Sequence, residues 1–275
     1  MHHSRIDPAP RNYAKMVRIA ERRQNGPSAA PDVVDVEALE RWLIRDAPRI
    51  GEVIELIERF FWGCVKVGFP LDRASIHVGT LHPQLAGYAW NWMASDQILD
   101  NVIVAIGARS EDAFKRNPLA LVFENGQRVR CDPQDSETAA RFPLMAELGA
   151  QGLTDYIARP VGAAGVFHNA ATIGTFRPGG FSEVEVVGLE RLFDLFALHI
   201  ERHIAEMIAQ NVARAYLGRS AGEKVLAGAI ARGAGERVRA VIWASDLRSF
   251  TDRTDSMPAE DVTAMLNAYF GAMTE

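Results

Sequence analysis

The sequence has few cysteines and no cluster of basic residues. Only two of its 275 residues are cysteine, and Cys64 and Cys131 lie outside any Cys-x-x-Cys or Cys/His spacing. We therefore expect neither a disulfide scaffold nor a structural zinc site. Lys and Arg number 30 against 35 Asp and Glu, and the formal net charge is −5 at pH 7. Because nucleic-acid surfaces need clustered Lys and Arg, DNA and RNA are not expected partners.

Long apolar runs are also missing. No segment has the roughly 18 consecutive apolar residues of a membrane span, and the N-terminal stretch has no apolar core of the signal-peptide type. A cytoplasmic protein with no membrane partner is therefore expected. The hydrophobic fraction of 48% is that of a globular chain with a sizeable core.

The first two thirds of the sequence predict an α+β domain. Residues 1–34 are polar, with scattered prolines, and are expected to form a loosely ordered leader. From residue 35, apolar residues at three- and four-residue steps predict two helices that break near Pro48. Strands are expected at 73–81, 85–92, 102–107, 119–123, 128–131, 157–161 and 166–176, with a helix near 137–149. The dipeptide Asn125-Gly126 predicts a hairpin turn, and residues 35–182 are expected to pack helices on one face of an antiparallel sheet.

This order of elements, with the run ATIGTFRPGGFSEVEVVGLERL in which a strand ends in a Gly-rich turn and enters a long helix, resembles a GAF domain. The similarity covers roughly residues 35–205. It implies a small-molecule sensor whose ligand the sequence does not name. Candidate pocket residues are Thr80, His82, Trp90 and Trp92. Trp90 and Trp92 share a strand face, so burial against the helices is the simpler account of the two indoles.

A long helix is predicted over 183–217, beginning with a capping box of Ser182 and Glu185. A stripe with alternating steps of four and three runs along it: Phe193, Ala197, Ile200, Ile204, Met207 and Asn211. This stripe predicts a coiled coil and a homodimer, in which Asn211 fixes the register of a parallel pair. The alternative is a single long helix lying on the sheet.

His199 and His203 lie beside this stripe. A zinc-protease helix needs Glu directly after its first His, and Ile200 stands there, so no metal site is expected. Because the two histidines lie beside the stripe and not in it, they are expected to be solvated or to lie at its rim. A flexible Gly-rich connector is expected over 218–236.

Residues 237–275 carry the most specific pattern. An apolar run ending at Asp246 predicts a buried strand that delivers a carboxylate at its tip, before a turn and an amphipathic helix. Such a carboxylate can bind a metal ion, and backbone N–H groups of a turn formed by Ser249, Phe250 and Thr251 can bond phosphate oxygens.

The stretch AVIWASDLRSFTDRTDSMPAEDVTAMLNAYF resembles the start of a class III adenylate/guanylate cyclase domain, with its Asp-x-x-x-Phe-Thr signature and Leu-Asn-x-Tyr-Phe helix end. The resemblance implies a ferredoxin-like fold whose first strand and helix lie at 237–275. It implies Asp246 and the carbonyl of Leu247 as metal ligands, Phe250 and Thr251 at the nucleotide phosphates, and Mg²⁺ or Mn²⁺ as cofactor of the full-length enzyme. The family's second aspartate, purine-selecting residues and Asn/Arg pair are missing, so this chain alone is expected to be inactive.

The combined expectation is the regulatory part of an adenylate cyclase, a phosphorus–oxygen lyase that makes cyclic AMP from ATP in the intact protein. An unknown effector would bind the GAF domain, and ATP rather than GTP is a family-level prediction. The alternative is a stand-alone GAF signalling module that binds a small molecule and dimerises, with a vestigial cyclase remnant.

Overall fold

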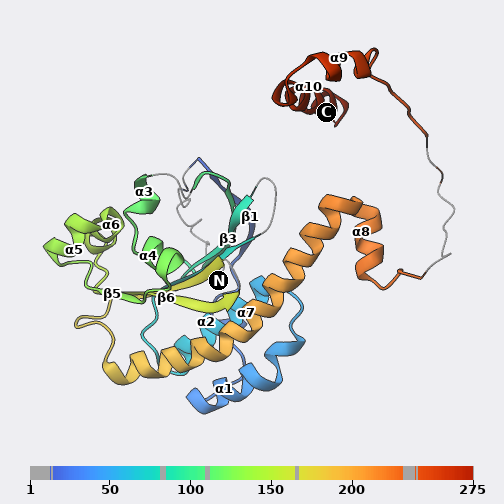
Figure 1. The fold of residues 1–275 in the computed structure, drawn as a ribbon. Helices are drawn as coiled ribbons and strands as arrows, with labels where there is room; N and C mark the ends of the chain where they lie inside the picture. The colour runs from blue at the N-terminus through green and yellow to red at the C-terminus, as the bar shows by residue number, and fades with distance from the viewer. Residues whose placement is uncertain are drawn as a thin grey trace, which may run out of the picture. The chain divides into compact units, whose positions relative to one another are not determined.

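The computed structural model describes residues 13, 15–80, 85–108, 112–164, 167–231, 239 and 241–274. The chain divides into two compact units, Met1–Ile230 and Ala231–Glu275. The described residues of the first unit form an α+β domain around one sheet, and those of the second form two helices and an irregular segment (Figure 1).

The sheet of the first unit has seven strands in the order β1-β4-β3-β2-β7-β6-β5. All neighbouring strands pair antiparallel. The strands are β1 (Val17–Arg23), β2 (Arg73–Gly79), β3 (Leu85–Met93), β4 (Ile98–Ala105), β5 (Val129–Cys131), β6 (Asp155–Ala164) and β7 (Phe167–Thr175). The expected loosely ordered leader is wrong for β1, which forms the edge of the sheet by pairing with β4.

Helices cover both faces of this sheet (Figure 1). On one face lie α1 (Val36–Arg45), α2 (Val53–Lys66) and α7 (Glu183–Leu217), with the 3-10 turns η1 (Gly26–Ala29) and η2 (Ala47–Arg49). On the other lie α3 (Asp112–Lys115), α4 (Pro118–Asn125), α5 (Ser136–Arg141) and α6 (Pro143–Ala150). No helix within the described ranges combines the length and hydropathy needed to cross a membrane.

The main core lies between the sheet and the helices α2 and α7, and we call this side the helical face. Phe60 of α2 stacks on Phe196 of α7 with ring centroids 4.1 Å apart and meets Phe193 edge-on at 5.1 Å. Trp92 of β3 packs against Phe61 and Trp62 of α2. Each of these rings removes a large apolar area from water, so this layer dominates the stability of the domain.

The stripe predicted for dimerisation belongs to this core. Phe193, Ala197, Ile200 and Ile204 are buried within their own domain, and Met207 packs against the same cluster. The alternative derived from the sequence, a long helix lying on the sheet, therefore describes this part of α7. These side chains already have intramolecular partners and would have to leave the core to form a dimer seam.

The strand predicted at 119–123 is wrong, because these residues form α4. Asn117 caps the helix by accepting a hydrogen bond from the backbone N–H of Leu119 at 2.9 Å, and Pro118 stands at its first position. Gly126 ends it in the left-handed conformation at φ 64°. Pro at the start and Gly after the end are helix signals, so Asn125-Gly126 is a helix end rather than a hairpin turn.

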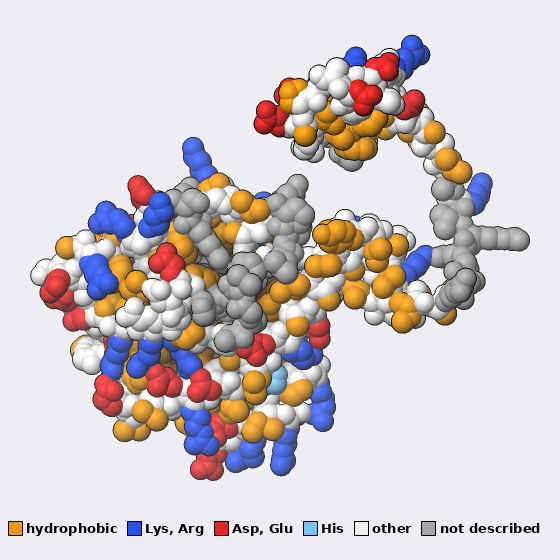
Figure 2. Space-filling model, viewed as in Figure 1, with side chains coloured by type: hydrophobic (Ala, Val, Ile, Leu, Met, Phe, Trp, Pro, Cys, Tyr) orange, Lys and Arg blue, Asp and Glu red, His pale blue; other side chains and the backbone are white. Residues whose placement is uncertain are grey.

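After α7 the chain forms a second helix, α8 (Arg219–Leu226), where a flexible connector was expected. Arg214 of α7 pairs with Glu223 of α8 at 3.1 Å. Exposed apolar side chains cover the end of α7 and α8, as Figure 2 shows. They include Val212, Tyr216, Leu217, Val225 and Leu226.

The second unit contains α9 (Phe250–Ser256) and α10 (Ala259–Thr274). The amphipathic helix predicted after Pro258 is present as α10. The buried strand predicted before Asp246 is wrong for the described residues 239 and 241–246, which have no regular structure. Val241 and Ile242 are 94% and 93% exposed, because a strand is stable only when neighbouring strands satisfy its backbone and cover its apolar face.

Candidate ligand-binding site

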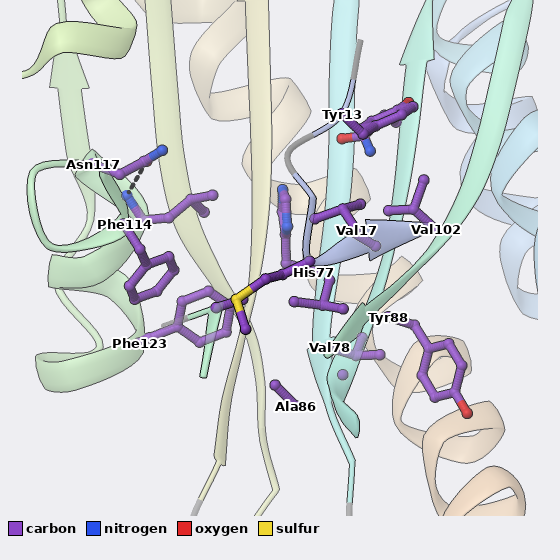
Figure 3. Close-up of a pocket in the computed structure, with 17 residues that line it drawn as sticks. Tyr13, Val17, His77, Val78, Ala86, Tyr88, Val102, Phe114, Asn117 and Phe123 are labelled. Carbon is purple, nitrogen blue, oxygen red and sulfur yellow. Dashed lines mark hydrogen bonds between the residues drawn. The ribbon is translucent and has the colours of Figure 1, made fainter. Parts of the chain in front are cut away.

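A cavity of about 320 Å³ lies on the face of the sheet opposite α2 and α7. We call this side the cavity face. The floor of the cavity comes from β2, β3 and β4, one wall from residues near β1, and the other from α3 and α4 (Figure 3). The lining residues are Tyr13, Met16, Val17, His77, Val78, Ala86, Gly87, Tyr88, Ala89, Asn91, Val102, Val104, Ala108, Phe114, Asn117, Leu119 and Phe123.

The alternation of side chains along the strands places the floor residues. Ala89 pairs with His77 of β2 and with Val102 of β4, so these three side chains share one face. Trp90 and Trp92, one residue on from Ala89 and Asn91, face the helices instead. At Gly87 the strands approach closely, since a Cβ there would lie 2.0 Å from the carbonyl oxygen of Val78. A side chain at position 87 would therefore push β2 and β3 apart.

A row of polar side chains crosses the cavity face. Asp100, Asn91, Ser75 and Thr172 are successive cross-strand neighbours on β4, β3, β2 and β7. The hydroxyls of Ser75 and Thr172 lie 2.6 Å apart. Buried polar groups need such partners, so the two hydroxyls satisfy each other at one end of the row, and the carboxylate of Asp100 lies at the other end.

His77 connects the cavity to this row. Its Nε2 lies 2.8 Å from the hydroxyl of Ser75, and its ring points toward the cavity among the labelled side chains of Figure 3. At the far end of the row Thr172 hydrogen bonds the hydroxyl of buried Tyr156, whose pKa is raised mainly by burial. The polar side of the cavity is thus a chain of hydroxyl and imidazole groups.

The wall formed by α3 and α4 is aromatic. Phe114 and Phe123 face each other with ring centroids 5.8 Å apart, and both point into the cavity in Figure 3. Asn117 lies between them in the sequence and serves both as the cap of α4 and as a lining residue. The cap thus fixes a polar amide beside two rings that offer flat apolar contact.

None of the 17 described lining residues is Asp, Glu, Lys or Arg. The wall is made of aliphatic and aromatic side chains with histidine, asparagine and tyrosine as polar groups. Small-molecule sites commonly have this composition: mostly apolar, with a few polar groups that orient the ligand. This cavity is therefore the candidate site of the domain.

The pocket residues predicted from the sequence do not come together here. Trp90 and Trp92 are buried on the helical face, in line with the simpler account of the indole pair. Thr80 is buried and its hydroxyl accepts a hydrogen bond from Nδ2 of Asn211 at 3.1 Å. His82 lies outside the described residues. The sequence analysis missed three residues of these strands that line the cavity: His77, Ala89 and Asn91. They could have been found from the alternation of the strands, because they lie on the face opposite the tryptophans.

Asn211 has a different role from the predicted one. Instead of facing a second helix, its amide reaches the end of β2 at Thr80. Beyond Asn211, no hydrogen bond links the rest of α7 to the sheet in the described chain. The Asn211–Thr80 contact therefore lies where the helix leaves the domain.

The two histidines of α7 were expected to be solvated or at the rim of the stripe. His199 is half-buried, in keeping with a rim position, whereas His203 is buried. The ring Nε2 of His199 donates to the carbonyl oxygen of Leu43 at 2.7 Å. His203 is 5% exposed, and its Nε2 accepts from Arg202 at 3.0 Å. Burial, with the nearby Arg202 charge, lowers the pKa of both imidazoles. The apolar face of α7 was predicted correctly. The edge of the helix that carries the two histidines is covered by α1 and by the connection between α1 and α2.

The predicted cyclase residues lie in the second unit. Asp246 is exposed, Leu247 is half-buried, and Ser249 adopts a left-handed conformation at φ 57° just before α9, which begins at Phe250 and includes Thr251. No group of three or more His, Cys, Asp or Glu side chains forms a metal site within the described ranges. A two-metal site needs more than one carboxylate, so these residues alone do not fit the metal site that the resemblance implies.

No family model and no curated protein matches the sequence. Among solved structures, the chain is similar to the GAF domain of a phosphoenolpyruvate-protein phosphotransferase from Coxiella burnetii, with 14% identity, 64% of this chain and 98% of that chain covered, and a TM-score of 0.43. It is also similar to the phycocyanobilin-bound GAF domain of a cyanobacterial phytochrome, with 14% identity, coverage of 63% and 98%, and a TM-score of 0.42. The GAF domain of a sensor histidine kinase from Bacillus halodurans has 12% identity, coverage of 62% and 96%, and a TM-score of 0.32. With TM-scores of this size, we base the proposed function on the cavity itself.

Proposed function

We propose that the first unit is a GAF-like sensor that binds a small, uncharged and largely apolar molecule in the cavity. The observation that carries this proposal is the lining, which combines aromatic and aliphatic side chains with the polar groups of His77, Asn91 and Asn117. The helical face supplies the stability of the domain, which leaves the cavity face available for binding.

The chemistry of the wall favours a planar aromatic ligand with one or two hydrogen-bonding groups. Phe114 and Phe123 offer flat contact surfaces, and His77 and Asn117 offer polar contacts beside them. A phosphate or carboxylate group would lose its water without meeting a cation among the described lining residues, which costs several kcal/mol. The proposed ligand class therefore differs from cyclic nucleotides.

The binding proposal can be tested with prodan, a neutral naphthalene fluorophore whose emission shifts to the blue in apolar surroundings. We expect saturable binding with a blue shift, and competition by other neutral aromatic compounds but not by cyclic AMP. Ala89→Phe fills the floor of the cavity and is expected to lower the affinity for prodan at least tenfold, or about 1.4 kcal/mol. Unchanged affinity of this variant would contradict the site.

We also propose that the sensor regulates an adenylate cyclase in a protein that carries the rest of the cyclase domain. The cyclase-like signature at 246–251 and the helix α10 after it support this assignment. The helices α7 and α8, which follow the sensor in the chain, would transmit the state of the cavity. A ligand could shift such an output only by binding the two states with different affinity.

The cyclase assignment is tested by Asp246→Ala in a longer protein that contains the remaining cyclase residues. We expect loss of cyclic AMP formation, with prodan binding unchanged. Asp255→Ala is the matched control, because Asp255 has no role in the family pattern and should leave activity intact. An active Asp246→Ala enzyme would overturn the metal-ligand role of Asp246 and leave the sensor proposal standing.

A further inference from the structure

One wall of the cavity comes from a short segment near the N-terminus. Tyr13, Met16 and Val17 all line the cavity, and we call these three residues the N-terminal strap. The carbonyl oxygen of Met16 accepts a hydrogen bond from the backbone N–H of Ala105 at 2.9 Å, and Val17 pairs with Val104. The strap thus extends the pairing of β1 with β4 along the rim of the cavity.

A buried carboxylate anchors this strap. Asp100 of β4 is 0% exposed. The hydroxyl of Tyr13 donates to its Oδ2 at 2.9 Å, and Arg22 of β1 donates through Nε to Oδ1 at 2.6 Å and through Nη2 to Oδ2 at 2.9 Å. Loss of a partner from a buried carboxylate is costly, so the Tyr13 bond favours the closed position of the strap, while the two Arg22 bonds hold β1 against β4.

The strand that carries the strap is paired on one side alone and is largely exposed. β1 lies at the edge of the sheet and has β4 as its single neighbour. Most of its residues are exposed, and a bulge between Ile19 and Glu21 interrupts its pairing. Segments with few buried contacts open at low free energy. The opposite wall, by contrast, is fixed by the cap of α4 and by the packing of Leu119 and Val122 in a second apolar cluster.

We propose that Tyr13 is a positioning residue that holds the N-terminal strap closed over the cavity, and that ligands enter and leave when the strap lifts away from Asp100. The part of this inference that concerns ligand exchange rests on the proposed function. The opening itself is a property of the described fold and can be measured without a ligand.

The test introduces a thiol on the floor of the cavity by Ala89→Cys and follows its alkylation by N-ethylmaleimide under native conditions. Ala89 is 3% exposed, so the reagent reaches position 89 when the strap opens. Adding Tyr13→Phe removes the hydroxyl that binds Asp100 and keeps the ring. Because one hydrogen bond is lost from the closed state, we expect alkylation at position 89 to accelerate about fivefold.

Two controls separate opening of the strap from general destabilisation. Tyr88→Phe is the matched change at a lining tyrosine outside the strap and should leave the rate at position 89 unchanged. Cys64, buried in the helical core, reports global unfolding in the same sample through mass spectrometry of the labelled peptides. With Tyr13→Phe we expect faster labelling at position 89 and an unchanged rate at Cys64.

The outcomes distinguish this inference from the proposed function. An equal rate at position 89 with and without Tyr13→Phe, or a parallel rise at Cys64, would overturn the role of Tyr13. Faster labelling at position 89 alone supports the strap even if prodan fails to bind, and the proposed function would then be wrong while the strap remains.

Discussion

One face of the sheet packs against α2 and α7 through aromatic rings, whereas the opposite face carries a polar row and a cavity. Trp90 and Trp92 stand on the first, and Ala89 and Asn91, their neighbours in the same strand, on the second. Because side chains alternate along a strand, β3 serves both faces at once. Large apolar side chains give the domain its stability, and small or polar ones leave room for a ligand.

This comparison implies that the two faces respond differently to substitution. A change on the helical face should alter the free energy of unfolding, and a change on the cavity face should alter binding. The polar row lies between these extremes, since its two hydroxyls bond each other and that of Ser75 also contacts His77.

The largest effect is expected from Phe196→Ala on the helical face. Phe196 is fully buried and stacks on Phe60, so its truncation leaves a cavity in a close-packed layer and should lower the free energy of unfolding by about 3–5 kcal/mol. Urea denaturation measures this loss. Leu198→Ala on the same helix is the control, because Leu198 is 63% exposed and its truncation should cost about 0.5 kcal/mol or less. Equal losses would contradict the assignment of the core.

The same substitution on the two faces sharpens the comparison. Ala74 of β2 is buried on the helical face and Ala89 of β3 on the cavity face. Ala74→Phe should destabilise the domain by about 1–3 kcal/mol through overpacking, whereas Ala89→Phe should change stability less and abolish most prodan binding. Denaturation and fluorescence titration of both variants measure the two effects. A larger destabilisation by Ala89→Phe would mean that the cavity is not open space.

A smaller effect is expected where α7 leaves the sheet. Asn211→Leu removes the hydrogen bond to Thr80 and leaves the hydroxyl of Thr80 without this partner, at a cost of about 1 kcal/mol. Thr80→Val should cost a similar amount, and the double variant should cost less than the sum of the two. Sedimentation of the same variants tests the predicted homodimer. A change of oligomeric state with Asn211→Leu would favour the coiled-coil role of Asn211 over the contact with Thr80.

Much of the fold could be predicted from local patterns in the sequence. The capping box of Ser182 and Glu185 is present and starts α7 as predicted, and the period-two residues of β2 and β3 face as expected. The strand predicted at 119–123 failed because an apolar run of this length suits either structure, although Asn117, Pro118 and Gly126 were helix signals. The N-terminal strand was missed because β1 is polar and its pairing with β4 is a long-range contact.

The candidate site was harder to predict than the fold. Its floor includes small or polar residues such as Ala89 and Asn91, which carry no periodic signal of their own. Its walls come from segments far apart in sequence, as Tyr13 and Phe123 illustrate. The stripe on α7 was correctly recognised as apolar, but one sequence does not say whether such a stripe packs on its own sheet or on a second copy.

The smallest effect is expected from mild acid, and it should act on the helical side. The pKa values of His199 and His203 are lowered from their ordinary value of 6.5 by burial and by Arg202, so the unfolded chain binds protons more readily than the folded one. Their contribution to stability is present above pH 6.5 and is lost as the pH falls below this value toward the folded-state pKa values.

Glu185 affects the free energy of unfolding in a separate pH range. Hydrogen bonds from Arg177 and from the backbone and hydroxyl of Ser182 lower its pKa to about 2 from the ordinary 4.5, so its contribution is lost only as the pH falls below about 4.5. The free energy of unfolding measured at several pH values between about 7.5 and 5.5 therefore isolates the histidines. His203→Gln should flatten this dependence, because the amide accepts from Arg202 without titrating. An unchanged slope would show that His203 takes up protons equally in the folded and unfolded states over this range, and that the acid sensitivity comes from elsewhere.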